Sequence, residues 1–336
     1  MIARLLLALT LSVAAPTFAE EPNRFAFTQS AAERIEIGAT LAERFGSGPV
    51  AVILIPGLAS GPWAWQDAVN DLKKDHTVYV LTLPGFDGRP AVAKPAGIGA
   101  AQEALRELIA SRKLDRPVLI GHSLGGTLSL GFAARHPDLV RGVVSLDGLP
   151  LFPGTEDWDL KRRGGVAAAI AQRKRRPPAQ FAAEQQQYMR GIGVTDMARA
   201  DELAKLTARS DPAAVMRYVG EVMTLDLRPV LASIKAPVLV LSPYLQLDAD
   251  QQTMTEASKT AYYTALMDGT PNLKVVSVPQ ARHFAMFDQP QLVNGAIRDF
   301  LKTLEVGEAG DQPPVTGGKK ATSPPSWMTV SGMHIT

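Results

Sequence analysis

The chain has no cysteine among its 336 residues, and this absence excludes several kinds of site. Disulfide bonds, thiolate nucleophiles, iron–sulfur clusters and zinc sites with cysteine ligands all require that side chain. The sequence also lacks a His-Glu-x-x-His motif, a phosphate-binding loop with lysine, and a Gly-x-Gly-x-x-Gly turn after a strand. We therefore expect chemistry based on oxygen and imidazole groups, with no metal and no other cofactor.

The chain also has little excess charge of either sign. Its 35 Lys and Arg residues and 33 Asp and Glu residues leave a net charge of +2, which provides no basic field for a nucleic-acid backbone. Aromatic residues are few, at 6%, yet hydrophobic residues reach 46%, enough to bury a large core. We expect a globular protein that acts on a small molecule, and the composition leaves its oligomeric state open.

The two ends of the chain are expected to lie outside the folded domain. Residues 1–19 begin with one positive charge at Arg4, continue with the apolar run Leu5 to Ala15, and end on small Ala19, the order typical of a secretory signal peptide. The run is shorter than the roughly 20 residues that span a bilayer, so we expect no membrane span and an exported protein, periplasmic or secreted. The alternative is a first helix packed on the domain. Residues 307–336 are rich in Pro and Gly without an apolar period, which predicts a disordered tail.

Short apolar runs alternate with helical patterns along the rest of the chain. The run Val50 to Ile55 stops at Pro56-Gly57, which is typical of a strand buried on both faces of a sheet. Strands that alternate with helices predict parallel pairing with right-handed crossovers. We therefore predict an α/β fold with a mostly parallel, doubly wound central sheet. The expected strands are 50–55, 76–83, 117–120, 140–146, 237–241 and 273–278, and the expected domain core is 20–150 with 229–306.

Between residues 151 and 228 the alternation of strands and helices stops. This segment is rich in Ala, Gln, Arg and Lys, and it has helix breakers at Gly164-Gly165 and Pro177-Pro178. We predict a helical lid of several short helices that covers an apolar pocket and shifts to admit substrate. Its basic runs, 161–163 and 173–176, have two interpretations: recognition of an anionic substrate or membrane surface, or ordinary solvated helix faces.

The clearest catalytic signal is the pentapeptide Gly121-His122-Ser123-Leu124-Gly125. It lies between a strand and a helix, where a Gly-x-Ser-x-Gly turn forms a nucleophile elbow that holds the serine hydroxyl above the sheet's carboxyl edge. A serine hydroxyl is a weak nucleophile until a base takes its proton. Among the five histidines, only His283 falls in a turn directly after the last strand, where its imidazole could reach Ser123. The competing interpretations are a glycine-rich turn with an incidental serine and a structural surface histidine.

These motifs and two others occur in an order found in a known superfamily. They are Ile55-Pro56-Gly57-Leu58, Gly121 to Gly126, the segment His136 to Val144, and the turn with His283. With them, the chain from Val50 to Leu304 resembles the α/β-hydrolase superfamily, and in particular its lid-bearing bacterial serine hydrolases with esterase-like, lipase-like or cofactor-free perhydrolase activity. The resemblance implies Ser123 as the nucleophile, His283 as the base, and an oxyanion hole made by the backbone N–H groups of Leu58 and Leu124.

The sequence leaves the acid of the triad open. Most superfamily members carry it in a Gly-x-x-Asp loop after the seventh strand, whereas here Asp248 and Asp250 follow that strand without a glycine turn. Asp147 instead ends the sixth strand, on the same sheet edge as Ser123, and some superfamily members place the acid there. We predict Asp147 as the acid, with Asp248 and Asp250 as the alternatives and a Ser–His dyad without an acid as the remaining one.

The resemblance implies a hydrolase that cleaves a carboxylic ester or lactone through an acyl-enzyme intermediate. Two alternatives use the same residues, namely a C–C bond hydrolase and a cofactor-free perhydrolase. A third, from another class, is a non-catalytic binding protein that keeps the fold. Trp63 and Trp65, just past the oxyanion loop, either line a pocket for an acyl chain or pack the first helix. The expected partner is a small acyl compound of largely apolar character.

Overall fold

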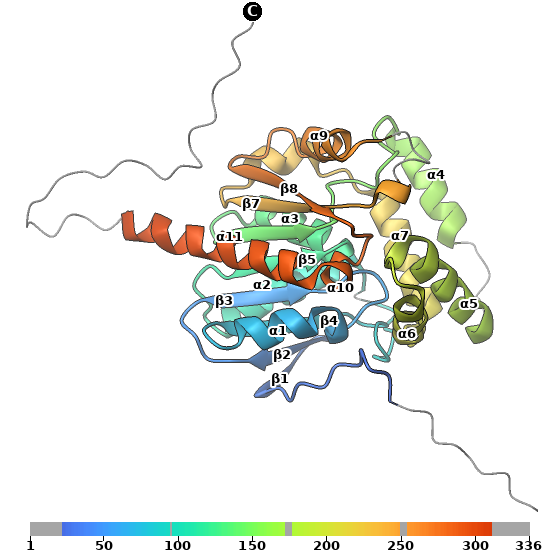
Figure 1. The fold of residues 1–336 in the computed structure, drawn as a ribbon, viewed down its shortest axis with the longest axis horizontal. Helices are drawn as coiled ribbons and strands as arrows, with labels where there is room; N and C mark the ends of the chain where they lie inside the picture. Colours follow the sequence, from blue (N-terminus) through green and yellow to red (C-terminus); the bar gives the residue numbers. More distant parts are fainter. Residues whose placement is uncertain (1–21, 95, 172–176, 249–253, 311–336) are drawn as a thin grey trace, which may run out of the picture.

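The computed structural model describes residues 22–94, 96–171, 177–248 and 254–310. Within these ranges, eight strands form one sheet in the order β1-β2-β4-β3-β5-β6-β7-β8, with helices on both faces (Figure 1). β2 runs antiparallel to both of its neighbours, and all the other strand pairs are parallel. The predicted α/β fold class is therefore confirmed. The strands are β1 Glu33–Ile37, β2 Thr40–Phe45, β3 Ala51–Ile55, β4 Thr77–Thr82, β5 Val118–His122, β6 Gly142–Leu146, β7 Val238–Tyr244 and β8 Leu273–Pro279.

The central strands are buried because helices cover the sheet on both sides. One face packs against α1 (Gln66–Leu72) and α11 (Pro290–Gly310), and the other against α2 (Ile98–Ser111), α3 (Leu124–Arg135) and α9 (Glu256–Leu266). In β3, Ile53 and Ile55 join the core on the α2–α3 side, whereas Val52 and Leu54 join the core on the α1–α11 side. Alternate side chains of a strand point to opposite faces, so a strand covered on both sides has a continuous apolar run.

The first two strands, β1 and β2, were not among the strands that the sequence predicted. In β1 only Ile35 and Ile37 are buried, and the other three residues of the strand are charged. The charged side chains pair across the two strands, with Arg34 bonded to Glu43 at 2.5 Å. A strand at the end of a sheet that buries one face only has no continuous apolar run, so a search for such runs does not find it.

The segment between β6 and β7 is helical in its described part and lies beyond the carboxyl ends of the parallel strands (Figure 1). We call residues 151–228 the insertion. It leaves and rejoins the domain at one place, where Leu151 and Asp226 form an isolated antiparallel bridge and the Leu227 N–H donates to the Pro150 carbonyl at 2.8 Å. Its elements are α4 Leu160–Ala171, α5 Pro178–Tyr188, a π-helical turn η2 Met189–Gly193, α6 Met197–Thr207 and α7 Pro212–Thr224.

In the basic run 161–163, Lys161 and Arg162 are exposed, as expected of a solvated helix face, but Arg163 departs from both interpretations. Arg163 is 2% exposed, so it neither faces solvent nor can meet a substrate or a membrane. Its guanidinium donates to the carbonyls of Thr155, at 2.6 Å, and Leu225, at 3.0 Å. It therefore ties α4 to the first and last segments of the insertion. The second basic run, 173–176, lies outside the described residues.

The ends of the chain differ from the prediction in one respect. α11 continues to Gly310, so the start of a tail at residue 307 was predicted too early. The expected signal peptide, 1–19, and the rest of the expected tail, 311–336, lie outside the described residues. None of the helices in the described ranges is both long enough and apolar enough to cross a membrane.

Candidate active site

Ser123 lies in the sharp turn between β5 and α3. Its backbone has φ 52° and ψ −118°, a conformation that residues other than glycine rarely adopt and that the surrounding structure has to hold. The Ser123 N–H donates to the Leu146 carbonyl at 2.8 Å, which fixes the turn to the end of the neighbouring strand β6. The side chain is half-buried at the carboxyl edge of the sheet. This conformation is that of the predicted nucleophile elbow.

The two glycines of the pentapeptide are required by close backbone contacts. A Cβ atom at Gly121 would lie 2.1 Å from the Gly125 carbonyl oxygen, and one at Gly125 would lie 2.1 Å from the Ile55 carbonyl oxygen. No side chain fits at either position unless the backbone moves. The glycines therefore allow α3 to start close enough to β3 and β5 for Ser123 to sit at its first turn.

The loop after β3 lies directly against the elbow. A Cβ atom at Gly57 would be 3.2 Å from the Ser123 Cβ. The next residue is Leu58, whose N–H is one of the two predicted oxyanion donors. The other donor, Leu124, is the first residue of α3, where N–H groups have no acceptor within the helix. The structure thus brings the loop after β3 and the start of α3 to the two sides of Ser123.

Ser210 of the insertion fixes the loop that carries Leu58. Its hydroxyl accepts a hydrogen bond from the Asp87 N–H at 3.1 Å and donates one to the Ala59 carbonyl at 3.1 Å. The next residue, Asp211, donates its N–H to the Gly85 carbonyl at 2.7 Å. The turn between α6 and α7 therefore joins the loop after β3 to the loop after β4, and sequence reasoning gave no sign of this link.

His283 and Asp147 form a hydrogen-bonded pair at the same edge of the sheet. Asp147 directly follows β6, His283 lies in the turn after β8, and 2.5 Å separates Asp147 Oδ2 from His283 Nδ1. Both side chains are largely buried: 13% of the Asp147 side chain and 17% of the His283 side chain are exposed. Burial raises the pKa of Asp147, but the charge and the hydrogen bond of His283 outweigh this effect and lower it to about 2. Asp147 is therefore a carboxylate at neutral pH that accepts a hydrogen bond from the Nδ1–H of His283.

The alternative acids are not in this position. The Asp248 carboxylate accepts two hydrogen bonds from the Arg282 guanidinium, both at 2.7 Å. It is thus paired with the residue before His283 and not with the imidazole. Asp250 lies outside the described residues. Within the described part of the chain, Asp147 is the carboxylate that contacts His283.

His122 has a role that sequence analysis missed. Its ring is fully buried, its centre lies 4.6 Å from that of His283, and its Nε2 lies 2.9 Å from the His283 carbonyl oxygen. Burial, followed by the positive charge of His283, lowers the pKa of His122 to about 3. His122 is therefore neutral, and its Nε2–H donates to the carbonyl. The hydrogen bond of His122 thus ties the turn of Ser123 to the turn of His283. The one sequence feature that could have indicated this role is the position of His122 inside the pentapeptide.

The insertion also holds the turn that carries His283. The His283 N–H donates to the Ile192 carbonyl at 3.1 Å, and the Phe284 N–H donates to the Gly193 carbonyl at 2.9 Å. Both acceptors belong to η2, a π-helical turn of a kind often found at functional sites. The ring of Tyr188, at the end of α5, stands perpendicular to the His283 ring with 6.2 Å between their centres. The insertion therefore reaches the site directly.

Asp288 strengthens the same contact. Its side chain is fully buried and accepts hydrogen bonds from the Thr195 N–H at 3.0 Å and the Thr195 hydroxyl at 2.9 Å. It also accepts one from the Arg282 N–H at 2.9 Å. One carboxylate thus joins the turn before His283 to the segment after η2.

Trp63 and Trp65 pack inside the domain. Each is 1% exposed, and Trp63 stacks on Phe284 with 6.1 Å between ring centres and 16° between ring planes. Phe284 follows His283, so Trp63 packs against the turn that carries His283. Of the two interpretations of these tryptophans, the structure favours packing.

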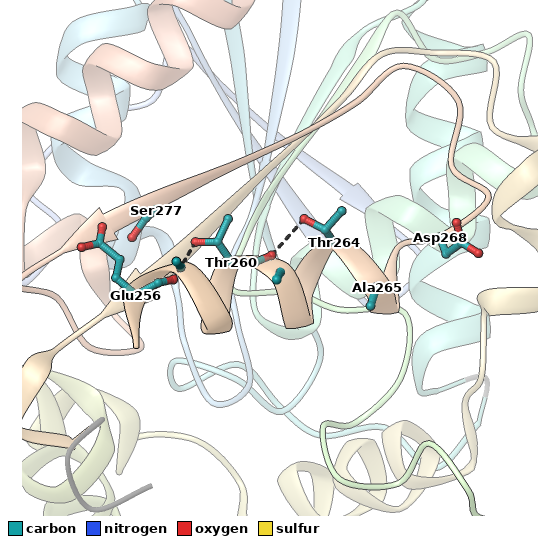
Figure 2. A pocket seen from close by; sticks show the side chains of 8 residues that line it. Glu256, Thr260, Thr264, Ala265, Asp268 and Ser277 are labelled. Carbon is teal, nitrogen blue, oxygen red and sulfur yellow. Dashed lines mark hydrogen bonds between the residues drawn. The ribbon is translucent and has the colours of Figure 1, made fainter. Parts of the chain in front are cut away.

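Two hollows of the described surface lie away from Ser123. One, of about 700 Å³, lies between α4, α7 and the loop 91–93. The other is a shallow groove along α9 and β8 (Figure 2), where the hydroxyls of Thr260 and Thr264 bond to carbonyls one turn earlier in the helix. Neither hollow contains a member of the Ser123 site. The described ranges also contain no group of three or more His, Asp or Glu side chains that could hold a metal ion.

Asp87, beside the Leu58 loop, leads to a prediction about the pH dependence of stability. Burial raises its pKa from 3.8 to about 6, although Arg209 lies 3.4 Å away. Because the folded state holds the proton more tightly, the resulting stability is present below pH 3.8 and is lost as the pH rises through about 6. Asn cannot ionise, so Asp87→Asn does not undergo this loss. We expect the free energy of unfolding of the variant, relative to that of the wild type, to be about 2 kcal/mol higher at pH 8 than at pH 4.

Urea unfolding of the wild type and of Asp87→Asn between pH 4 and pH 8 measures this difference. The matched control is Asp115→Asn, because the Asp115 side chain is 80% exposed and its replacement should give no such gain. A difference between Asp87→Asn and the wild type that stays constant over this pH range would contradict the prediction.

Comparison with known proteins agrees with this geometry. A family model described as "Alpha/beta hydrolase family" matches residues 52–296, a range that contains Ser123, Asp147 and His283. Among curated proteins, the chain is similar to the biotin biosynthesis bifunctional protein BioHC of Cellvibrio japonicus (strain Ueda107). The two are 26% identical over 259 residues, which are 75% of this chain and 48% of that protein. The chain thus spans about half the length of this relative.

Solved structures show the same fold. The enol-lactonase from Burkholderia xenovorans has a TM-score of 0.64 at 20% identity, over 80% of this chain and 100% of that chain. The thermophilic esterase from Thermogutta terrifontis has a TM-score of 0.63 at 21% identity, over 81% of this chain and 99% of that chain. At such low identity the likeness concerns the fold alone.

Proposed function

Because the chain belongs to the alpha/beta hydrolase family, we propose that it is a serine hydrolase that cleaves a carboxylic ester or lactone. The observation that carries the proposal is the pair His283–Asp147 at the sheet edge where the strained turn presents Ser123. A nucleophile, a base and a group that orients the base are the parts that acyl transfer needs.

The geometry suggests a two-step reaction. The Nδ1–H of His283 donates a hydrogen bond to Asp147, and Nε2 is therefore free to take the proton of the Ser123 hydroxyl. The Ser123 oxygen attacks the carbonyl carbon, and the N–H groups of Leu58 and Leu124 stabilise the negative charge on the carbonyl oxygen. The bond between the acyl carbon and the alcohol oxygen then breaks while His283 returns the proton to that oxygen, so that the alcohol leaves and an acyl-enzyme remains.

The second step repeats the first with water as the nucleophile. His283 takes a proton from the water, the resulting oxygen attacks the acyl carbon, and the bond to the Ser123 oxygen breaks. The proton returns to Ser123, and the carboxylic acid leaves. For a lactone the leaving alcohol stays attached to the acyl part, so the product is one hydroxy acid.

We propose an acyl group of apolar character. The Tyr188 ring contacts His283, and Ile192, whose carbonyl accepts from the His283 N–H, is 55% exposed. The insertion thus places an aromatic ring and an exposed apolar residue close to the turn of the base. The structural neighbours named as an enol-lactonase and an esterase support testing both kinds of ester.

We also propose that the insertion acts as a lid and that its parts differ in mobility. η2 is bonded to the turn of His283 and α4 to the ends of the insertion through Arg163, so a rigid movement of the whole insertion would displace the base. Opening therefore has to involve α5 rather than η2. The order of residues 1–19 supports the further proposal that the mature protein acts outside the cytoplasm.

Labelling with a fluorophosphonate tests the proposal, because such a reagent reacts with an activated serine. We expect one adduct per chain, located by mass spectrometry at Ser123, together with hydrolysis of short p-nitrophenyl esters or simple lactones. A panel of acyl chain lengths then identifies the substrate class. No adduct and no turnover would favour the non-catalytic binding protein, and an adduct at another serine would place the site elsewhere.

A further inference from the structure

Asp147 has a second partner that the proposed mechanism does not use. Its Oδ2 accepts the hydrogen bond from His283, and its Oδ1 accepts one from the Tyr263 hydroxyl. We propose that Tyr263 is a positioning residue that fixes the Asp147 carboxylate toward His283. The inference rests on the proposed function, because Asp147 has to be oriented only if His283 acts as the base.

A carboxylate in this position needs to be held at both oxygens. Asp147 follows β6 in a loop, with φ 52° and its N–H bonded to the Leu241 carbonyl at 3.0 Å, so its main chain is fixed. The terminal torsion of an aspartate has a broad distribution, so the carboxylate plane is not fixed by the main chain. The Tyr263 hydroxyl on Oδ1 holds this plane, and Oδ2 then lies in line with the imidazole N–H of His283.

Tyr263 is suited to this role by its burial. Its side chain is 5% exposed, and a buried tyrosine hydroxyl needs a partner. Burial and the negative charge of Asp147 raise the pKa of Tyr263 well above its ordinary value of 10.0. The hydroxyl therefore keeps its proton, and remains a donor, throughout the pH range in which an ester hydrolase works.

A positive charge from the same helix acts on Asp147. Lys259, one turn before Tyr263, places its ammonium nitrogen 5.7 Å from the centre of the Tyr263 ring, and its charge contributes to the lowered pKa of Asp147. The inner face of α9 thus supplies one hydrogen bond and one positive charge on the side of Asp147 away from His283. Both favour the ionised carboxylate.

The phase of α9 follows from its sequence. The helix starts with a reciprocal cap between Thr255 and Ser258. At 3.6 residues per turn, Lys259, Tyr263 and Leu266 fall on one face of α9. The groove in Figure 2 includes Ala257, Ala261 and Thr264, which fall on the opposite face. The chain after β7, which carries the acid itself in most superfamily members, here supplies the partner of the acid.

Tyr263→Phe tests this inference, with Tyr262→Phe as the matched control. Tyr262 is the neighbouring residue, and its hydroxyl bonds to Glu156 instead of Asp147. For Tyr263→Phe we expect kcat to fall about 10- to 100-fold while KM stays within about twofold, because a hydrogen bond to a charged acceptor is lost. We also expect the low-field proton resonance of the His283 Nδ1–H to shift. Tyr262→Phe should leave both at wild-type values.

The readouts separate this inference from the proposed function. If Ser123→Ala abolishes ester hydrolysis but Tyr263→Phe keeps wild-type kcat or an unshifted resonance, then the positioning role is wrong and the serine hydrolase stands. An equal loss of kcat in Tyr262→Phe also overturns the positioning role, since it would report general damage to α9. If Ser123→Ala itself retains hydrolysis, the proposed function fails first.

Discussion

Ser123→Ala is expected to lower kcat for a short p-nitrophenyl ester by roughly 10⁵- to 10⁶-fold, the loss seen when the nucleophile of a serine hydrolase is removed. The Ser123 hydroxyl is the group that forms the acyl-enzyme, and the turn that carries it lies against the Leu58 loop. The residual rate should come from the oxyanion donors and substrate binding, so KM should change little.

The variant is also expected to fold normally. The substitution removes only the hydroxyl oxygen and leaves a Cβ atom in the same place in the turn at φ 52°. Ser111→Ala is the control, because it removes a hydroxyl at the end of α2 that bonds to the Leu108 carbonyl. Thermal unfolding and steady-state kinetics of the three proteins answer the question. Full hydrolysis by Ser123→Ala would mean that the elbow is a structural turn and that the reaction occurs elsewhere.

The sequence predicted the parts of the fold that depend on local patterns. A strand covered on both faces is apolar over most of its length, so β3, β5 and β6 were recognised from apolar runs in the sequence, and their residues are buried in the structure. β1 was missed because charged residues alternate with apolar ones along it, and β2 because Glu43 and Arg44 interrupt its apolar residues and pair with charged residues of β1. The end of α11 was placed too early because the sequence from residue 307 onward is rich in Pro and Gly, whereas the helix continues to Gly310.

The site was predictable only where a motif fixes the backbone. Gly121 and Gly125 are required by close contacts with neighbouring backbone in the elbow and in the sheet. The pentapeptide motif contains both glycines, so the elbow can be recognised from the sequence. The hydrogen bonds that hold His283 come instead from η2, and that of Asp147 comes from α9. Such partners are far apart in sequence and have ordinary residue types. No local pattern distinguishes them.

Arg163 shows the same limit for charge. Three consecutive basic residues in a helix usually face solvent, and nothing in the run 161–163 marks its last member as different. Its burial depends on the carbonyls of Thr155 and Leu225, which the insertion brings together where it leaves and rejoins the domain. Burial of a charge is tolerated only where such acceptors converge, and their convergence is a property of the fold.

The sequence left three candidates for the acid of the triad, and the structure pairs one of them, Asp147, with His283. Substitution of each candidate tests this assignment. Asp147→Asn is expected to lower kcat by about 10⁴-fold while leaving the fold intact. The amide of Asn would donate to His283 Nδ1, so the ring proton would move to Nε2, where the base has to be free. Tyr263 can still donate to the amide oxygen, which keeps the side chain in place and limits the change to the tautomer of His283.

Asp248→Asn is the matched control, since it makes the same chemical change in the residue that pairs with Arg282. Arg282 also donates to the Arg190 carbonyl at 2.9 Å, so it remains anchored to the insertion and kcat should stay within about tenfold of the wild type. Asp250→Asn completes the set of sequence candidates. Near-normal turnover in Asp147→Asn with collapse in either of the others would mean that the carboxylate bonded to His283 is not the acid on which the reaction depends. Loss in Asp147→Asn alone would assign that role to the end of β6.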